Sequence, residues 1–182
     1  MSKETIQGFQ LSPQQKHLWQ LQKSDSNHPY KSLCAILIEG KVDTETLKAA
    51  LNNVVNRHKI LRTTFHCLPG MTIPLQVIND SSILSIQNHN LIGLEPQEQD
   101  LRIEGLFQEA KQQTFDFEQC PLLPISLITL SPSRYVLLVR LPAMNADAAT
   151  LKNLMLEISQ AYTACLYPTF RTLTVTSSLV LN

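Results

Sequence analysis

The fold of this chain is decided by the stretch Val139-Arg140-Leu141-Pro142-Ala143-Met144-Asn145-Ala146-Asp147-Ala148. Residues 135–141 are apolar apart from Arg140 and short enough to predict a strand, and residues 150–166 predict the helix that follows. A second apolar segment, residues 123–130, lies just upstream and is separated from the strand by Ser-Pro-Ser-Arg, so the two predict a hairpin. The quoted stretch is therefore a loop between a strand and a helix.

Two earlier segments carry patterns of their own. The first is Leu11-Ser12-Pro13-Gln14-Gln15-Lys16-His17-Leu18-Trp19, which predicts a capped helix as far as Gln22 because Ser12 and Gln15 form a capping box around Pro13. The second is Arg57-His58-Lys59-Ile60-Leu61-Arg62-Thr63-Thr64-Phe65, where a helix is expected to end and a strand to begin.

In their order and spacing, these three segments resemble the core motifs of nonribosomal peptide synthetase condensation domains. The family's opening motif has a Ser-x-x-Gln run, its second motif reads Arg-His-x-x-Leu-Arg-Thr-x-Phe, and its third reads His-His-x-x-x-Asp-Gly. The third motif is degenerate here, because Pro142 and Ala143 occupy the two histidine positions and Ala148 replaces the glycine, whereas Asp147 is kept. The resemblance extends over residues 9–167.

The resemblance implies an α+β fold, a two-layer sandwich that forms one lobe of the chloramphenicol-acetyltransferase-like fold. Residues 1–167 would form this condensation-like N-terminal lobe. Residues 168–182 depart from the family and have a composition typical of a strand, so this divergent tail is expected to supply an added strand or a dimer contact.

The element order expected from the residues themselves agrees with such a lobe. The predicted order is a helix at 12–22, a strand at 33–38, a helix from Asp43 or Thr44, strands at 61–66, 75–78 and 83–87, a helix from Pro96, and then the hairpin and the last helix. The second helix is expected to bury an apolar stripe: Leu47, Ala50, Leu51, Val54 and Val55. The helix from Pro96 is expected to bury Leu101, Leu106, Phe107 and Ala110.

The resemblance also indicates what chemistry is missing. In the family, phosphopantetheine arms of two carrier proteins enter a tunnel between two lobes, and the second motif histidine is credited with acyl transfer. Ala143 can neither position an amine nor take its proton, so no catalytic residue is expected and the chain is not expected to be an enzyme on its own. The chain itself is expected to bind no cofactor and no metal.

Asp147 has two interpretations that remain open. The resemblance implies a structural ion pair with Arg57 or Arg62, whose loss would leave a buried, uncompensated charge. Alternatively, Asp147 caps the helix that begins at Ala148 or Ala149. His58 is expected to be structural.

The other histidines offer no better site. His17 is expected at the surface or in packing, and the pattern around His28, His66 and His89 does not favour metal binding.

The composition and charge of the chain bear on which classes of binding partner are expected. Lys plus Arg and Asp plus Glu are 15 each, without a basic run, so neither nucleic acid nor a membrane surface is favoured. The sequence shows no signal core or apolar span, which favours a cytoplasmic protein. The cysteines are expected to be buried and reduced: Cys34, Cys67, Cys120 and Cys165.

Three functions follow as hypotheses. The first is a non-catalytic lobe that packs against neighbouring synthetase domains, an adenylation domain or a carrier protein. The second is the N-terminal half of a condensation domain that forms amide bonds between carrier-bound thioesters. The third is a platform that recruits a tailoring enzyme or a carrier protein. A homodimer through the tail or through the face left by the missing lobe is also expected.

Overall fold

The computed structural model describes residues 8–24, 30–82 and 84–166. The elements in chain order are β1 (Gly8–Gln10), α1 (Pro13–Ser24), β2 (Lys31–Glu39), α2 (Thr44–Arg57), a 3-10 helix η1 (Lys59–Arg62), β3 (Thr63–His66), β4 (Leu75–Ile78), β5 (Ile86–Asn90), α3 (Pro96–Gln112), β6 (Ile125–Ser131), β7 (Arg134–Pro142) and α4 (Ala148–Leu166).

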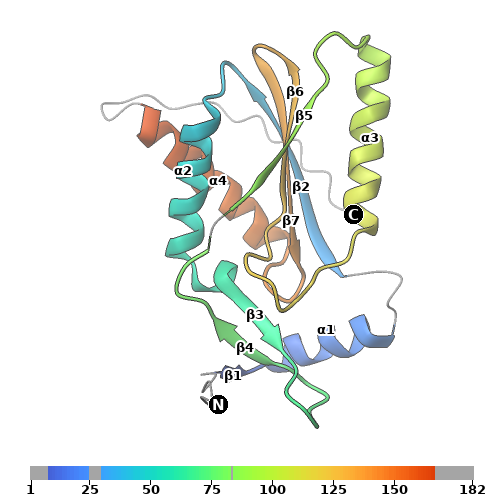
Figure 1. Cartoon of the computed structure of the whole chain (residues 1–182), viewed down its shortest axis with the longest axis vertical. Helices are drawn as coiled ribbons and strands as arrows, with labels where there is room; N and C mark the ends of the chain where they lie inside the picture. Colours follow the sequence, from blue (N-terminus) through green and yellow to red (C-terminus); the bar gives the residue numbers. More distant parts are fainter. Residues whose placement is uncertain (1–7, 25–29, 83, 167–182) are drawn as a thin grey trace, which may run out of the picture.

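The larger sheet has the strand order β2-β7-β6-β5. Its pairs are antiparallel except for β5 and β6, which run parallel, and the predicted β6–β7 hairpin is confirmed. Helices α2 and α4 cover one face of this sheet and α3 covers the other (Figure 1). The predicted α+β class is confirmed: α2 and α4 with the sheet form two layers, and α3 adds a helix on the opposite face.

Side chains alternate along β7, so this one strand contributes to the apolar clusters on both faces of the larger sheet. Leu137, Val139 and Leu141 belong to the main core beneath α2 and α4. Val136 instead packs with the small cluster beneath α3. Both faces are covered, so β7 carries buried apolar side chains on both sides, with Arg140 as its one buried charge among the described residues of the strand.

The main core contains the whole apolar stripe that the sequence predicts for α2. All five of its residues are buried: Leu47, Ala50, Leu51, Val54 and Val55. Helix α4 contributes a matching stripe: Leu151, Leu154, Met155, Ile158 and Tyr162.

Helix α3 begins at Pro96 as predicted, with a capping box between Glu95 and Glu98. Leu106 and Ala110 are buried as predicted. The burial predicted for Leu101 is wrong, because this side chain is 75% exposed. Five residues along a helix correspond to a rotation of about 140° beyond one full turn, which turns Leu101 away from the stripe that contains Leu106.

Phe107, also predicted to be buried, is only partly so. The Lys111 ammonium lies 4.8 Å from the centre of the Phe107 ring. The side chain therefore lies at the border of the packed stripe, under a cation.

The smaller sheet has the order β1-β4-β3 and is antiparallel. A second apolar cluster joins it to α1 and includes Leu11, Phe65 and Met144. The sequence did not predict β1, because a strand of three residues is too short to show an alternating pattern. Leu61 and Arg62 were predicted as strand, but they form the 3-10 turn before β3.

Three other predictions need adjustment. Strand β5 lies at Ile86–Asn90 instead of 83–87, and residue 83 is outside the described residues. Cys34 is buried, but Cys67 and Cys165 are exposed, contrary to the predicted burial. The tail predicted at 168–182 lies outside the described residues. None of the described helices is both long and apolar enough to cross a bilayer.

Candidate functional site

The motif loop, residues 142–147, joins β7 to α4 through a tight turn. The N–H of Asn145 donates to the carbonyl oxygen of Pro142 at 2.9 Å. The N–H of Ala143 donates to the carbonyl oxygen of Tyr30 at 3.0 Å, which extends the pairing of β7 with β2 by one residue. Pro142 is buried and Ala143 is half-buried. Neither side chain can gain or lose a proton.

The three segments singled out in the sequence meet at this loop. Gln15 of α1 donates from Nε2 to the carbonyl oxygen of Met144 at 3.1 Å. Asn145 donates from Nδ2 to the carbonyl oxygens of Ile60 at 2.8 Å and Thr63 at 3.4 Å. The loop is thus held by side chains and carbonyl groups of both earlier motifs. The sequence alone does not indicate that Gln15 and Asn145 hold the loop, because their partners lie far away along the chain.

The structure supports the second interpretation of Asp147, in which it caps the helix that follows. Its Oδ1 accepts a hydrogen bond of 2.7 Å from the N–H of Thr150 in the first turn of α4. This bond lowers the pKa of the Asp147 carboxyl, whose side chain is exposed. The predicted ion pair with Arg57 or Arg62 is wrong, because both guanidinium groups are engaged elsewhere and no ion pair joins either of them to Asp147 within the described chain.

Arg57 and His58 both contact Glu157 of α4. The distances are 2.7 Å from Arg57 Nη1 to Oε1 and 2.6 Å from His58 Nε2 to Oε2. Burial raises the pKa of Glu157, but the hydrogen bonds and charges of His58 and Arg57 outweigh it, so the pKa lies below its usual value. This cluster ties the end of α2 to the middle of α4, in agreement with the structural role predicted for His58.

Arg62 is buried and serves the smaller sheet. Its Nη1 donates to the carbonyl oxygens of Asn79 and Asp80, the latter at 3.0 Å. Asn79 returns a bond of 2.9 Å from Nδ2 to the carbonyl oxygen of Arg62 and another of 3.1 Å to Thr64 Oγ1. The arginine of the second motif therefore fastens β3 to the segment after β4.

The remaining histidines are dispersed. His17 is exposed on α1, and His66 Nε2 lies 2.9 Å from Thr64 Oγ1. His89 lines a small pocket beside α3, and His28 is outside the described residues. Among residues 8–24, 30–82 and 84–166, no three His, Cys, Asp or Glu side chains gather in a group that could hold a metal ion.

Two cations that the sequence analysis missed close the C-terminal end of α3. Lys31 Nζ donates to the carbonyl oxygens of Ala110, Lys111 and Gln113 at 3.2, 2.5 and 2.6 Å. Arg140 Nη1 donates to the carbonyl oxygens of Ala110 and Gln113, both at 3.2 Å. The last carbonyl groups of a helix lack partners within it and carry partial negative charge, so both cations are well placed.

Desolvation by burial and the neighbouring Arg140 charge lower the pKa of Lys31 to about 8. Burial also lowers the pKa of Arg140. A sequence feature could have identified this residue, because Arg140 is a charge within an apolar strand and must have buried partners. We call Lys31 and Arg140 the α3 clamp.

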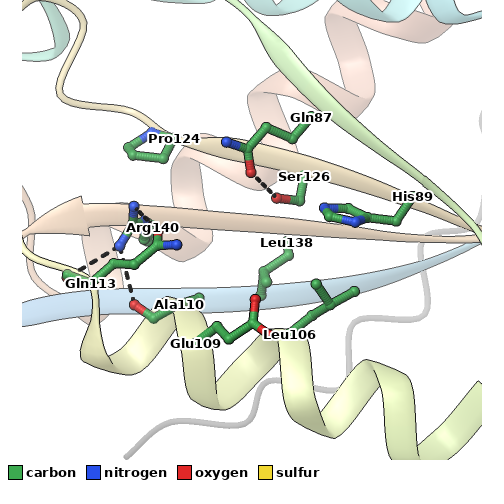
Figure 2. Close-up of a pocket in the computed structure, with 10 residues that line it drawn as sticks. All are labelled: Gln87, His89, Leu106, Glu109, Ala110, Gln113, Pro124, Ser126, Leu138 and Arg140. Atoms are coloured by element: carbon green, nitrogen blue, oxygen red, sulfur yellow. Dashed lines mark hydrogen bonds between the residues drawn. The ribbon is translucent and has the colours of Figure 1, made fainter.

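Arg140 of the α3 clamp borders a small pocket between α3 and the sheet (Figure 2). Gln87, His89, Glu109 and Gln113 line it together with Arg140, and the cavity measures about 40 Å³. Figure 2 shows the Arg140 guanidinium directed toward Ala110 and Gln113 at the end of α3. A space of this size holds a few water molecules and is far below the volume of an acyl-substrate site.

Comparison with known proteins places this loop and the sheet behind it within a matched region. A family model described as Condensation domain matches residues 6–167. The chain belongs to the condensation domain family. Tyrocidine synthase 3 of Brevibacillus parabrevis is 32% identical over 155 residues, which are 85% of this chain and 2% of that protein. Surfactin synthase subunit 2 of Bacillus subtilis is 27% identical over 157 residues, or 86% of this chain and 4% of that protein.

Solved structures give the same assignment for the fold of this condensation-domain chain. The starter condensation domain of the rhizomide synthetase RzmA superposes with a TM-score of 0.77 and 20% identity, over 92% of this chain and 40% of that one. The X-domain in the complex with OxyB from teicoplanin biosynthesis has a TM-score of 0.76 and 22% identity, over 96% and 36%. The predicted condensation-type fold is confirmed. The chain spans about two-fifths of these structures.

Proposed function

We propose that this chain is a non-catalytic condensation-like lobe that packs beside neighbouring domains of a nonribosomal peptide synthetase. One observation carries the proposal. The motif loop is fully built and held in place, yet the position that corresponds to the second motif histidine is Ala143. The scaffold of the site is present and its reacting group is replaced by a methyl group.

The polar groups that remain in the loop support this proposal because they act on the fold. The amide of Asn145 bonds to backbone carbonyls, the carboxylate of Asp147 caps α4, and the N–H of Ala143 bonds to Tyr30. None of these groups has the near-neutral pKa that a general base for amine attack requires. Among the described histidines, His58 is paired with Glu157 and His66 with Thr64, so both have bonding partners outside the motif loop.

A single-turnover assay tests the absence of catalysis. The chain is mixed with one carrier protein loaded with a donor aminoacyl thioester and another loaded with an aminoacyl acceptor. We expect amide formation at the uncatalysed aminolysis rate, with no change in the variants Ala143→His and Pro142→His/Ala143→His, since this chain spans only one side of the family's two-lobed tunnel. Product above the uncatalysed rate with the unaltered chain contradicts the proposal and supports the condensing enzyme.

The packing role is tested by binding. Titrating the chain with the adenylation domain and the carrier protein of its synthetase, followed by calorimetry, should show association with at least one of them. Binding to a tailoring enzyme alone would favour the recruitment platform instead. The variant Leu101→Asp, altered on exposed α3, distinguishes a docking face on that helix from one elsewhere.

A further inference from the structure

Strand β2 is the edge strand at one side of the larger sheet (Figure 1). The N–H of Ala143 donates to the carbonyl oxygen of Tyr30, and the N–H of Gly40 donates to the carbonyl oxygen of Ser133 at 2.9 Å. Because bonded and non-bonded positions alternate in an antiparallel pair, the even-numbered residues of β2 exchange hydrogen bonds with β7. The odd-numbered residues direct their N–H and carbonyl groups away from β7. Within the described ranges of the chain, no strand other than β7 pairs with β2.

The odd-numbered side chains of β2 form an apolar strip that the helices leave partly exposed. The even-numbered Cys34 and Ile36 belong to the main core beneath α2 and α4, so the odd-numbered side chains point to the opposite face. On that face, the apolar cluster beneath α3 contains no residue of β2. Leu33, Ala35 and Leu37 are only partly buried there. A long edge with apolar side chains is a template for pairing with another chain.

The two charged residues of β2 stand at its opposite ends and have opposite signs, with Lys31 first and Glu39 last. The Lys31 ammonium bonds to carbonyl oxygens at the end of α3, but among the residues described no carboxylate forms an ion pair with it. Glu39 is exposed at the other end. Such an edge is complementary to an antiparallel copy of itself, whereas a parallel copy would place like charges side by side.

We infer that the outer edge of β2 pairs antiparallel with β2 of a second copy of this chain, in a two-fold symmetric dimer. The two four-stranded sheets then form one continuous sheet, and both copies contribute the same residues to the interface. Ala35 lies on the two-fold axis, opposite its own counterpart. Leu33 lies opposite the partner subunit's Leu37. Lys31 lies opposite the partner subunit's Glu39, which supplies the carboxylate that this cation lacks.

The alignment centred on Ala35 is the one that the edge favours. It pairs all nine residues of β2 and brings the outward N–H and carbonyl groups of the two edges together, because odd-numbered residues lie opposite odd-numbered ones. A shift by one residue would set the outward groups of one copy against positions of the other that bond to β7. A shift by two residues would keep the hydrogen bonds but place Lys31 opposite Leu37, or Glu39 opposite Leu33.

Sedimentation of the intact chain tests whether the dimer forms. Analytical ultracentrifugation from about 1 μM to about 1 mM covers dimers with binding free energies down to about 4 kcal/mol. We expect the average mass to rise from that of the monomer to that of the dimer within this range. A monomer at every concentration overturns the inference.

Single cysteines test the alignment, in a background in which the exposed Cys67 and Cys165 are replaced by serine. Ala35→Cys places two thiols opposite each other at a Cα separation of about 5.5 Å, within the range of a disulfide, so mild oxidation should give a covalent dimer. Leu33→Cys alone should give none, because its two copies lie about 13 Å apart along the strands. Mixed with Leu37→Cys, it should cross-link.

The cross-linking result can contradict the dimer directly. A sample that sediments as a dimer but forms no disulfide through Ala35→Cys overturns the inference. A covalent dimer of Leu33→Cys alone does so as well, because it requires another alignment of the two strands.

A charge reversal tests the ends of the interface. Glu39→Lys sets two ammonium groups opposite each other at both ends and should weaken the dimer by at least about tenfold. Glu104→Lys makes the same change of net charge at an exposed position of α3 and should leave the dissociation constant unchanged. Equal weakening by both variants overturns the inference, because net charge would then control association. None of these outcomes bears on the proposed lack of catalysis, which the carrier-protein assay tests.

Discussion

Asp147 shows how a motif residue can keep its place while its partner differs from the expected one. Its carboxylate binds the N–H of Thr150 and so satisfies one of the donors that the first turn of α4 leaves unpaired. Asp43 does the same for α2, with a bond of 2.7 Å to the N–H of Thr46. Each of the two helices on this face of the sheet thus begins with an aspartate cap.

The first prediction concerns this cap. Asp147→Ala should lower the midpoint of thermal unfolding by a few degrees at neutral pH, whereas Asp147→Asn, which can still accept the bond, should lower it much less. The Thr150 hydrogen bond lowers the pKa of Asp147 below 3.8 in the folded state. The stabilisation is therefore present above that pH and lost as the pH falls through the lower, folded-state pKa.

Calorimetric scans from about pH 2 to 7 check this prediction. The difference between the wild type and Asp147→Ala should shrink toward the acidic end. A difference that stays constant over this range would mean that the carboxylate charge contributes nothing.

Helix α3 depends at its C-terminal end on residues from other elements. Lys31 of β2 and Arg140 of β7 donate to carbonyl groups that the helix cannot satisfy itself, and both cations lie near the Phe115 ring, at 6.0 and 5.2 Å from its centre. Among the described residues, the apolar cluster between α3 and the sheet is small, with three buried and three partly buried members. The α3 clamp therefore fixes a helix that packs over a limited area.

The second prediction addresses the α3 clamp. Arg140→Leu keeps an apolar stem on β7 but removes the hydrogen bonds to Ala110 and Gln113, and we expect a loss of about 1.5–3 kcal/mol in the free energy of unfolding. Arg134→Leu, at an exposed position on the same strand, should change it by less than about 0.5 kcal/mol. Urea titrations measure both. Equal losses would show that the carbonyl bonds of Arg140 are not what stabilises α3.

At the scale of the whole molecule, the main core holds α2, α4 and the larger sheet together. Leu151 is fully buried in it, whereas Leu156, on the same helix, is 48% exposed. Val139 and Leu141, just before the motif loop, are also fully buried in this core. The position of the loop is thus set by the packing of the layers behind it.

The third prediction follows from this packing. Leu151→Ala should destabilise the protein by about 2–5 kcal/mol, because it removes packed atoms and leaves a cavity. Leu156→Ala should cost less than about 0.5 kcal/mol. Denaturant unfolding of both variants, compared at equal m-values, measures the difference. A similar cost at the two positions would place the core of α4 on another face of the helix.

Local patterns in the sequence determined most of the elements of this protein. The α2 stripe, the capping box at Ser12, the β6–β7 hairpin and the start of α3 at Pro96 each depend on residues a few positions apart. The three motifs likewise sufficed to identify the family, because motif order is a property of the sequence.

Only the tertiary structure decided which side chains pair with groups that lie far away along the chain. The sequence allowed Asp147 to pair with either Arg57 or Arg62. In the folded chain, Arg57 pairs with Glu157 of α4 instead, and Arg62 donates to a backbone carbonyl after β4. Arg140 found its acceptors 27 and 30 residues away, and the phase of α3 turned Leu101 to solvent. Such pairings depend on how whole elements pack in three dimensions, and sequence spacing does not encode that geometry.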